Sequence, residues 1–381
     1  MIVFGWSMRR RFVLESGITF LNHGSLGATP RVVLAAAERW RRRMEANPDR
    51  FMRETLPGAL RAAAARLARF LGADAQDVAF VENASTGMNA VLRSLELRRG
   101  DEILANTHTY NAVHQTIRHV CERTGARLVD APITIPVKDA SSLVSAIERR
   151  ISKRTRLVVL DHIASPTGLV FPVKRLAAIA HKRGARVLVD GAHAPGQLDL
   201  DIPSLGADWY VGNCHKWMFA PRASGFLWAR RDAQAGLHPP VISHGYEKGF
   251  AAEFDWTGTR DFSAWLAVPD AIEFYKQMKP ARIRSHNNRL ASRAARRISA
   301  AWNMPLDGPA ELHASMAGVR IPEPLQRYSE LGLMAELRVK HRINVAIVPI
   351  AGVLWARLSA QIYNTPADFE RLESAISRMA K

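Results

Sequence analysis

The chain has 381 residues, of which 48% are apolar and 23% charged, so it can bury a sizeable core and is long enough for more than one domain. Lysine and arginine outnumber aspartate and glutamate by 53 to 35, and the formal net charge is +18. The arginines are scattered from Arg9 to Arg378, and no aromatic residues are interleaved with them for base stacking. This pattern favours a solvated basic surface over a nucleic-acid site.

Cysteine content and hydropathy indicate the compartment. Two cysteines, Cys121 and Cys214, are too few for a disulfide framework and lack the spacing of a structural zinc site. No stretch approaches the ~18 apolar residues that a membrane span needs, and the amino-terminal apolar stretch precedes its arginines, the reverse of a secretory signal. We therefore expect a cytoplasmic protein with no metal site and with no membrane or nucleic-acid partner.

Short apolar runs bounded by turn residues predict, in chain order, buried strands at 78–81, 103–104, 157–160, 187–189 and 226–228. Segments with helical periodicity separate them, at about 86–97, 111–124, 140–152 and 174–183. The alternation predicts an α/β fold of three layers, in which a mainly parallel sheet lies between helices. Ligands of such sheets bind where the strands end, so polar residues after each run are the candidates for a site.

The last third of the chain has a different pattern. An Arg-rich stretch with helical spacing at about 284–303 precedes a proline-rich, irregular stretch at about 305–325. Apolar runs at 345–348 and 353–359 predict two further strands, and Thr365 is the expected N-cap of a final helix from Pro366. These changes predict an amino-terminal arm at 1–25, a large domain at 26–265 and a smaller α+β domain at 266–381.

Two residues after apolar runs carry the chemistry. Asp190 ends the predicted strand at 187–189, where an isolated aspartate is ordinarily a turn former. Lys216 follows a later apolar run, where an isolated lysine is ordinarily a surface charge. Together they supply what pyridoxal 5′-phosphate (PLP) needs, because an amine forms the Schiff base and a carboxylate keeps the ring nitrogen protonated.

The stretch around this pair reads LVDGAHAPGQLDLDIPSLGADWYVGNCHKWMFAPRASGFL. It resembles the class V aminotransferase family of fold type I PLP enzymes, and within it the isopenicillin N epimerase-like branch. The resemblance extends from Phe20 to about Leu372. It implies that PLP is the cofactor, that Lys216 is the Schiff-base lysine, that Asp190 is the partner of the ring nitrogen, and that the large domain binds the cofactor.

The same resemblance implies roles for residues around the ring. His193 matches a position that contacts the ring or its phenolic oxygen, and its alternative is a histidine at a helix entry. Tyr110 falls where the family places a ring stacked on the cofactor, although a core tyrosine at a helix start is an alternative, and His108 is a second candidate. Ser165 replaces a common asparagine at the phenolic oxygen. Because serine is shorter, that contact is either lost or bridged by water, and Asp161 and His162 are nearby substitutes.

Other residues are candidates for the cofactor's phosphate. Ser85 and Thr86 lie in a loop between a strand and a helix, where free N–H groups and small hydroxyls receive phosphate, although the same loop reads as an ordinary helix cap. The resemblance adds Asn213 and His215. It also implies that Thr259 reaches the phosphate of a second subunit, which requires an obligate homodimer with the active site at the interface.

For the substrate, the resemblance implies an amino acid. Asn22 and His23 lie in the family's amino-terminal substrate loop, within the arm at 1–25. Arg357 matches the arginine that forms a fork with the substrate carboxylate, a geometry that a guanidinium suits better than an ammonium. The alternative for Arg357 is a surface arginine at a strand edge.

The expected reaction begins when the Lys216 amine removes the Cα proton of an amino acid joined to PLP as an imine. Epimerisation, as in the isopenicillin N epimerase-like branch, is the main prediction, and it needs a second acid from Tyr110, His108 or the substrate-loop histidine. A C–S lyase acting on a cysteine derivative and an aminotransferase are the alternatives.

Cysteine desulfurase chemistry is disfavoured because no cysteine follows Cys214, which we interpret as a packing residue. A basic nucleic-acid-associated protein with a vestigial PLP site is the hypothesis from a different class.

Overall fold

The structure is a computed structural model that describes residues 3–381, so the first two residues of the predicted arm lie outside the described residues. Its largest element is a seven-stranded sheet in the order β2-β8-β7-β6-β5-β3-β4. Strand β8 runs antiparallel to β2 and β7 on its two sides, and all the other neighbouring strands of this sheet pair in parallel. The strands are β2 (Val78–Val81), β3 (Glu102–Asn106), β4 (Arg127–Ala131), β5 (Thr155–Asp161), β6 (Arg186–Gly191), β7 (Trp209–Asn213) and β8 (Gly225–Ala229).

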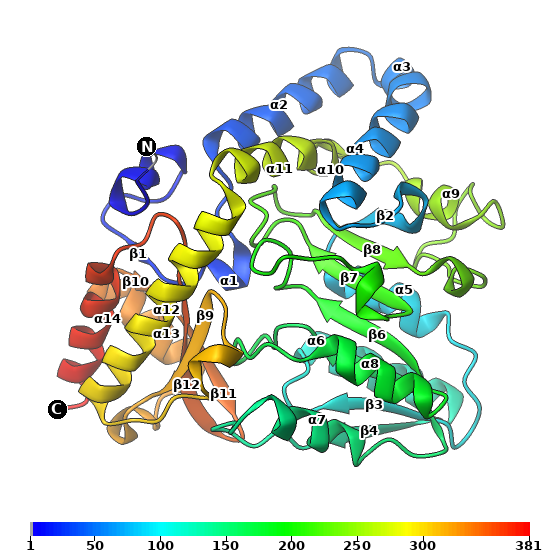
Figure 1. The fold of residues 1–381 in the computed structure, drawn as a ribbon. Coiled ribbons are helices and arrows are strands. Elements are labelled where there is room, and N and C mark those ends of the chain that lie inside the picture. The colour runs from blue at the N-terminus through cyan, green and yellow to red at the C-terminus, as the bar shows by residue number, and fades with distance from the viewer. Residues whose placement is uncertain (1–2) are drawn as a thin grey trace.

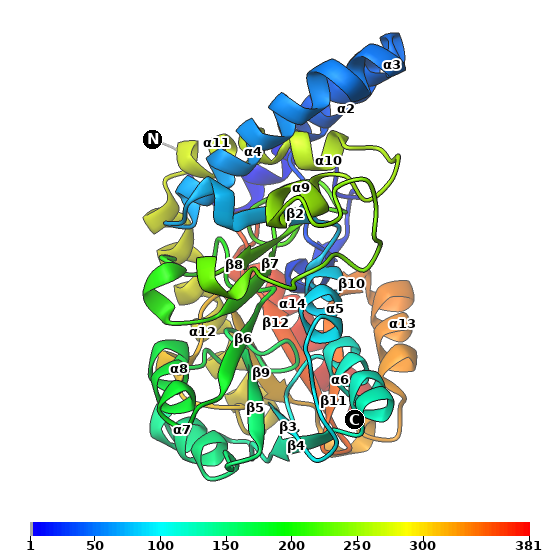
Figure 2. The same cartoon turned by 90° about the vertical axis from the view of Figure 1, so that its right-hand side faces the viewer.

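Helices cover both faces of this sheet. Figure 2 shows one face covered by α5 (Ala84–Arg93) and α6 (Asn111–Thr124), and the other by α7 (Ala140–Glu148) and α8 (Val173–Lys182). Side chains along a strand alternate between the two faces. In β5, therefore, Val158 and Leu160 join the apolar cluster of α7 and α8, while Leu157 and Val159 join that of α5 and α6. The predicted three-layer α/β fold with a mainly parallel sheet is confirmed.

A group of helices covers the β2–β8 edge, and Figure 1 shows α2 and α3 projecting beyond the body of the molecule. The first of these helices carry buried alanines and leucines at helical spacing, which pack against the later ones. The group comprises α2 (Arg31–Ala46), α3 (Pro48–Arg50), α4 (Leu56–Phe70), α9 (Phe250–Asp255), α10 (Ser263–Leu266) and α11 (Val268–Gln277).

A second, antiparallel sheet lies towards the carboxyl terminus, in the order β11-β12-β9. Its strands are β9 (Met316–Arg320), β11 (Ala346–Ile350) and β12 (Val353–Ser359). The long helix α12 (Pro280–Trp302) packs on β9 and on α14 (Pro366–Met379), and α13 (Glu330–His341) packs on β11. The short strand β1 (Thr19–Phe20) pairs with β10 (Ile343–Asn344), which joins the amino-terminal arm and the following α1 (His23–Leu26) to this part of the chain.

Most predicted elements are confirmed, and two boundaries were wrong. Helix α5 ends at Arg93 rather than near 97, and α7 ends at Glu148 rather than near 152. Leu95 and Leu97 prolong the helical pattern of α5, but they pack on the same apolar cluster from an irregular segment. Thr365 caps the final helix through a reciprocal pair of hydrogen bonds with Asp368, as the sequence predicted.

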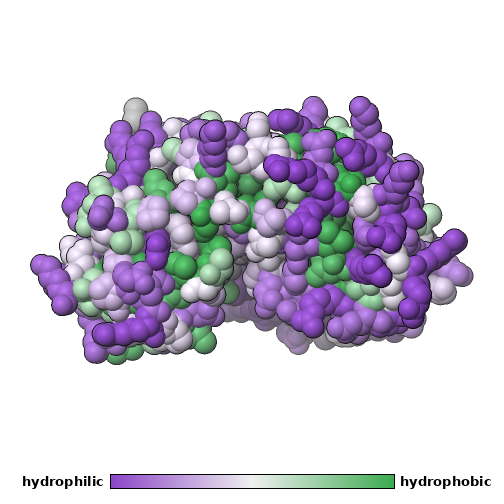
Figure 3. Space-filling view, turned by 90° about the horizontal axis from the view of Figure 1, so that it is seen from below, coloured by the Kyte–Doolittle hydropathy of each residue, from purple (hydrophilic) through white to green (hydrophobic). Residues whose placement is uncertain are grey.

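The surface is predominantly hydrophilic on the face shown in Figure 3, where apolar patches are small and surrounded by polar side chains. Several arginines in the described part of the chain form exposed ion pairs with a carboxylate four residues away, such as Arg42 with Glu38 and Arg53 with Asp49. No helix within residues 3–381 is both long enough and apolar enough to cross a membrane. Within the same residues, no group of three or more His, Cys, Asp or Glu side chains is arranged to hold a metal ion.

Candidate active site

A cavity of ≈ 320 Å³ lies at the carboxyl ends of the parallel strands, where the sheet faces α1. The loops that follow β2, β3, β5, β6 and β7 all contribute to it. Since parallel strands end at one edge of a sheet, residues far apart in the sequence meet there. The lining comprises Ser25, Leu26, Asn83, Ala84, Ser85, Tyr110, Asp161, Ile163, Ser165, Asp190, Ala192, His193, Asn213, His215 and Lys216.

Lys216 follows β7 and places its Nζ atom 3.1 Å from Nε2 of His193. Burial, and to a smaller extent the positive charge of Arg357, lowers the pKa of the Lys216 amine to about 7, although the nearby Asp190 acts in the opposite direction. The amine forms no ion pair with a carboxylate in the described part of the chain. Near neutral pH a substantial fraction of it is therefore unprotonated and able to act as a nucleophile or base.

Asp190 lies at the end of β6, and its side chain is almost fully buried. Its Oδ1 atom accepts one hydrogen bond, from the backbone N–H of Ala192 at 2.9 Å. Burial raises the pKa of the Asp190 carboxyl, and the neighbouring Lys216 partly offsets this increase. A buried carboxyl with a single backbone donor has acceptor capacity left for a cationic N–H group in the cavity.

His193 connects Lys216 to Ser165. Its Nε2 atom lies 3.3 Å from the Ser165 hydroxyl as well as close to Lys216, and the indole N–H of Trp217 donates to its Nδ1 at 3.4 Å. Burial, followed by the charges of Lys216 and Arg357, holds the pKa of His193 well below its usual value. A neutral ring that accepts at Nδ1 carries its proton at Nε2, the atom that faces Lys216 and Ser165.

The loop between β2 and α5 forms one end of the cavity. The Asn83 side chain caps α5 by accepting from the backbone N–H of Thr86 at 3.0 Å, and the Asn213 side chain accepts from the N–H of Ala84 at 2.9 Å. Ser85 lines the cavity, but the Thr86 hydroxyl lies 3.4 Å from Asn83 and is not part of the lining. The helix start, Ser85 and Asn213 thus form a small cradle of the kind that receives a phosphate.

His215 lies beside this cradle. Its Nδ1 atom is 3.0 Å from the carbonyl oxygen of Ser224, and burial lowers the pKa of its ring to about 4. The neutral ring therefore donates through Nδ1 to this carbonyl, which leaves Nε2 as the atom available to other groups.

Arg357 lies on β12 behind the cavity lining, where it contacts the lining residues Ser25 and Ser165, and it is only 3% exposed. Its Nη1 donates to the Ser165 carbonyl oxygen at 2.5 Å, and its Nη2 donates to the Ser25 hydroxyl at 2.6 Å and to Asn22 Oδ1 at 3.3 Å. Burial lowers the pKa of Arg357 to about 10, although the nearby Tyr110 raises it. No carboxylate in the described chain pairs with this guanidinium, so it is a buried cation suited to an anionic ligand.

Besides Thr86, Asn22 and Arg357, three further candidate residues are not part of the cavity lining. His23 is fully buried below it, where its ring contacts the Tyr363 hydroxyl at 2.8 Å and the Lys216 carbonyl oxygen at 3.0 Å. Thr259 is exposed and does not line the cavity, and neither does His108, whose buried ring nitrogens have no hydrogen-bond partner. Tyr110 lines the mouth of the cavity and is 47% exposed.

Sequence reasoning named Asp161 only as a substitute for Ser165, yet the structure places it in the cavity wall next to Asp190. Its Oδ2 atom accepts from the Asn106 amide at 2.9 Å and from the Thr109 hydroxyl at 3.4 Å. The available signal was the same as for Asp190, a carboxylate at the end of a buried strand. The other substitute, His162, is instead held by the Tyr210 hydroxyl at 2.9 Å.

The residues of the cavity fit PLP. A lysine amine without an ion pair, a buried carboxyl with free acceptor capacity and a helix N-terminus lie around one cavity, and these are the groups that the cofactor's aldehyde, ring nitrogen and phosphate require. The described part of the chain leaves the side chain of Lys216 accessible from the cavity. The geometry is therefore consistent with the cofactor expected from the sequence.

Comparison with known proteins identifies the family. The family model "Aminotransferase class-V" matches residues 20–372. The chain is 34% identical over 404 residues to an isopenicillin N epimerase of Amycolatopsis lactamdurans, covering all of both chains. It is 33% identical over 403 residues to a putative L-cysteine desulfhydrase of Oryza sativa subsp. japonica, covering 96% of this chain and 84% of the relative.

Solved structures show the same fold. An apo cysteine desulfurase of Thermococcus onnurineus NA1 superposes with a TM-score of 0.84 at 20% identity, covering 100% of this chain and 99% of that one. The cystine C–S lyase C-DES superposes with a TM-score of 0.81 at 21% identity, covering 95% of this chain and 98% of that one. The chain belongs to the class-V aminotransferase family of fold type I enzymes and uses pyridoxal 5′-phosphate as its cofactor.

Proposed function

We propose that this enzyme removes the Cα proton of an amino acid and returns a proton to the opposite face, so that it acts as an epimerase. PLP, when bound, supplies an electron sink that acidifies the Cα–H bond. The observation that carries the proposal is the Lys216 amine, whose pKa of about 7 allows it to accept a proton near neutral pH. The full-length relatives that are named isopenicillin N epimerase support the outcome.

The remaining residues bind and orient. Asp190 would hold the ring nitrogen through its buried carboxyl, and His193 and Ser165 would face the phenolic oxygen from the side of Lys216. Ser85, Asn213 and His215 would hold the phosphate with the N-terminus of α5, and Thr86 would help to fix this loop, because its backbone N–H donates to the Asn83 side chain. These assignments are supported by the shared cavity and by the hydrogen bonds that orient Asp190, His193, Asn213 and His215.

Arg357 would bind the carboxylate of the substrate. Its buried guanidinium has no carboxylate partner, and Asn22 and Ser25 hold its Nη2 atom in a fixed orientation. Asn22 would therefore act through Arg357, and His23 would support the loop from below through the backbone of Lys216. A carboxylate bound by a fixed guanidinium orients the Cα–H bond with respect to the base.

Epimerisation needs an acid on the face opposite Lys216, and we assign this role to Tyr110. Its side chain lines the mouth of the cavity and lies close enough to Arg357 to affect the pKa of that residue. His108 is the weaker choice because it does not line the cavity.

A C–S lyase is the second candidate. Relatives named L-cysteine desulfhydrase match 95% to 96% of this chain at 30% to 33% identity, and elimination from Cβ begins with the same proton removal. Aminotransfer is the third outcome of that step. A desulfurase mechanism stays disfavoured, because Cys121 and Cys214 are both buried and no cysteine follows Cys214. The hypothesis of a nucleic-acid-associated protein with a vestigial PLP site is disfavoured, because the chain belongs to an enzyme family and keeps Lys216 and Asp190 in one cavity.

The test is incubation of the PLP-loaded protein with L-amino acids, including L-cysteine, in deuterium oxide. Epimerisation gives the D-isomer with one deuterium at Cα, whereas lyase activity gives sulfide and pyruvate, and aminotransfer gives a keto acid. Lys216→Ala should abolish all three, with Lys182→Ala on the exposed surface as the matched control. If no amino acid acquires deuterium at Cα and none is consumed, the proposed reaction is wrong.

We propose further that two chains form a homodimer with the active site at the interface. Thr259 is exposed and outside its own cavity, as expected for a residue that serves a partner. Its segment is anchored by an ion pair between Arg260 and Glu82 and by the guanidinium of Arg260 over the Trp265 ring. Exposed apolar side chains at Leu26 and Val32 support an interface near the cavity mouth.

We also infer the domain division and the compartment. The seven-stranded sheet lies wholly within 26–265 and the three-stranded sheet wholly within 266–381, which supports the predicted boundary. Both cysteines are free and buried, which supports a reducing cytoplasmic setting.

A further inference from the structure

A pair of buried carboxyl groups forms part of the cavity wall. Asp161 is the last residue of β5, Asp190 lies near the end of β6, and the two are direct neighbours in the register of these parallel strands. Their exposed fractions are 2% and 5%, and both side chains line the cavity that contains Lys216. Two carboxylates this close in a desolvated wall repel each other, so the pair favours a state with one proton and one negative charge.

The two carboxyl groups have different surroundings. Asp161 is contacted only by neutral donors, the Asn106 amide of β3 and the Thr109 hydroxyl of the following loop. Asp190 accepts a hydrogen bond from the backbone N–H of Ala192, and the positive charge of Lys216 favours its ionised form. The positive charge of Lys216 thus stabilises the ionised form of Asp190, so we expect Asp190 to carry the negative charge of the pair.

Electrostatics agree with this geometry. Burial, and after it the repulsion from Asp190, raises the pKa of Asp161 to about 7, against the opposing effect of the hydrogen bonds from Asn106 and Thr109. Its Oδ2 atom already accepts two hydrogen bonds, so a proton on Asp161 resides on Oδ1.

We propose that Asp161 is a positioning residue that holds a proton next to Asp190, so that the pair presents one negative charge, located on Asp190, to the ring nitrogen of the cofactor. This inference rests on the proposed placement of Asp190 against the ring. Asn106 and Thr109 also connect Asp161 to the loop that carries Tyr110, so one hydrogen-bonded unit would align the ring-nitrogen partner with the stacking residue.

The experiment is difference infrared spectroscopy of the PLP-loaded protein, which detects the carbonyl stretch of a protonated carboxylic acid. We expect a signal at about pH 6 that decreases as the pH rises through the pKa of Asp161 and is lost by about pH 9. Asp161→Asn should remove this signal and keep the dissociation constant for PLP within about threefold, because an amide resembles the neutral acid. Asp190→Asn should weaken PLP binding by about 10-fold or more, because it removes a charge-assisted hydrogen bond.

Two results would overturn the proposal. If the signal persists in Asp161→Asn, the proton lies elsewhere, and if Asp161→Asn weakens PLP binding as much as Asp190→Asn does, Asp161 is the charged partner. Should Asp161→Asn not fold, Thr109→Val removes a donor that favours the ionised acid, so the midpoint of the signal should move to higher pH. Thr107→Val in the same loop, whose hydroxyl bonds to Ile133 instead, should leave the midpoint unchanged, and an unmoved midpoint in Thr109→Val contradicts the proposal.

These readouts are independent of the reaction. A protein that exchanges no Cα proton but shows the expected infrared changes would refute the proposed reaction alone. A normal affinity for PLP in Asp190→Asn would refute the placement of Asp190.

Discussion

At the residue scale, the site depends on charges that burial has altered. Lys216, in the cavity wall, and Arg357, buried behind it, carry positive charges that make it harder for neighbouring groups to gain a proton. Lys216 responds by losing its proton more readily, whereas a guanidinium stays charged. One cation therefore becomes a base while the other remains available for a carboxylate.

This difference predicts how attachment of the cofactor depends on pH. Because only the neutral amine attacks PLP, the rate of covalent attachment to the apoprotein should rise up to about pH 7 and then level off, since the pKa of Lys216 is lowered from 10.5 to about 7. Borohydride trapping at a series of pH values measures this rate. Arg357→Gln removes a nearby cation, so the plateau should begin at higher pH, while Arg338→Gln on the exposed surface of α13 should have no effect. A rate that keeps rising to about pH 10 would show an ordinary lysine.

At the element scale, the close packing of β6 against β7 requires glycine at position 191. A Cβ atom at Gly191 would lie 2.2 Å from ring atoms of Tyr210. The Tyr210 ring cannot yield easily, because it stacks on Phe226 with an interplanar angle of 7° and its hydroxyl contacts His162 at 2.9 Å. The absence of a side chain at Gly191 therefore lets β6 pack closely against Tyr210 of β7 at the position next to Asp190.

Gly191→Ala should therefore lower the free energy of unfolding by about 1–3 kcal/mol through overpacking. The matched control is Gly58→Ala in α4, where a Cβ atom meets no other atom within 4 Å. That substitution should raise the free energy of unfolding by about 0.5–1 kcal/mol, because alanine favours the helix. Urea denaturation of both variants measures the effect, and similar stabilities for the two would contradict the contact seen at Tyr210.

Sequence patterns predicted the presence of helices and strands more accurately than the residues at which they begin and end. The runs at 78–81 and 226–228 correspond to β2 and β8, and the helix at 111–124 has the predicted bounds. Strand β9 lies inside the stretch described from sequence as proline-rich and irregular, and it forms because β12 offers it an antiparallel partner. Pairing between distant strands has no signature in a local pattern.

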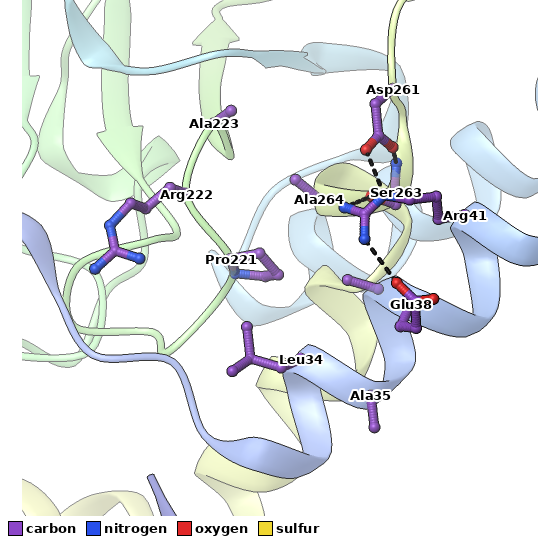
Figure 4. A pocket seen from close by; sticks show the side chains of 11 residues that line it. Leu34, Ala35, Glu38, Arg41, Pro221, Arg222, Ala223, Asp261, Ser263 and Ala264 are labelled. Atoms are coloured by element: carbon purple, nitrogen blue, oxygen red, sulfur yellow. Dashed lines mark hydrogen bonds and ion pairs between the residues drawn. The ribbon is translucent and has the colours of Figure 1, made fainter. Parts of the chain in front are cut away.

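At the scale of the whole molecule, the proposed dimer explains a hollow of ≈ 570 Å³ between α2 and the loop after Lys216. Figure 4 shows Leu34 of α2 facing Pro221 across this hollow, and Arg41 bridging Glu38 and Asp261 at its far side. Leu34 is 38% exposed and Val32, on the same helix, is 55% exposed. Helix α2 projects from the body of the molecule in Figure 1, and Arg41 joins it to Asp261, two residues after Thr259, so its exposed apolar side chains are suited to burial against a second chain.

We expect light scattering to give twice the chain mass of 42.3 kDa, and Leu34→Glu to shift the protein towards monomer. Burying a carboxylate in an apolar interface is unfavourable, so the monomer should also lose affinity for PLP if Thr259 serves the partner. Leu331→Glu is the control, because Leu331 is 71% exposed on α13, at a distance from α2 in Figure 1. A monomeric parent protein would exclude the proposed interface.

The sequence by itself determined the three-layer fold, the family and the cofactor, because these depend on local patterns and on a contiguous motif. Only the tertiary structure decided that Asp161 adjoins Asp190, that Arg357 is buried beside Lys216, and that His23 turns away from the cavity. The register between β5 and β6 and the packing of β12 and α1 against the sheet edge set those contacts. Such contacts join residues far apart in the chain, so no local pattern records them.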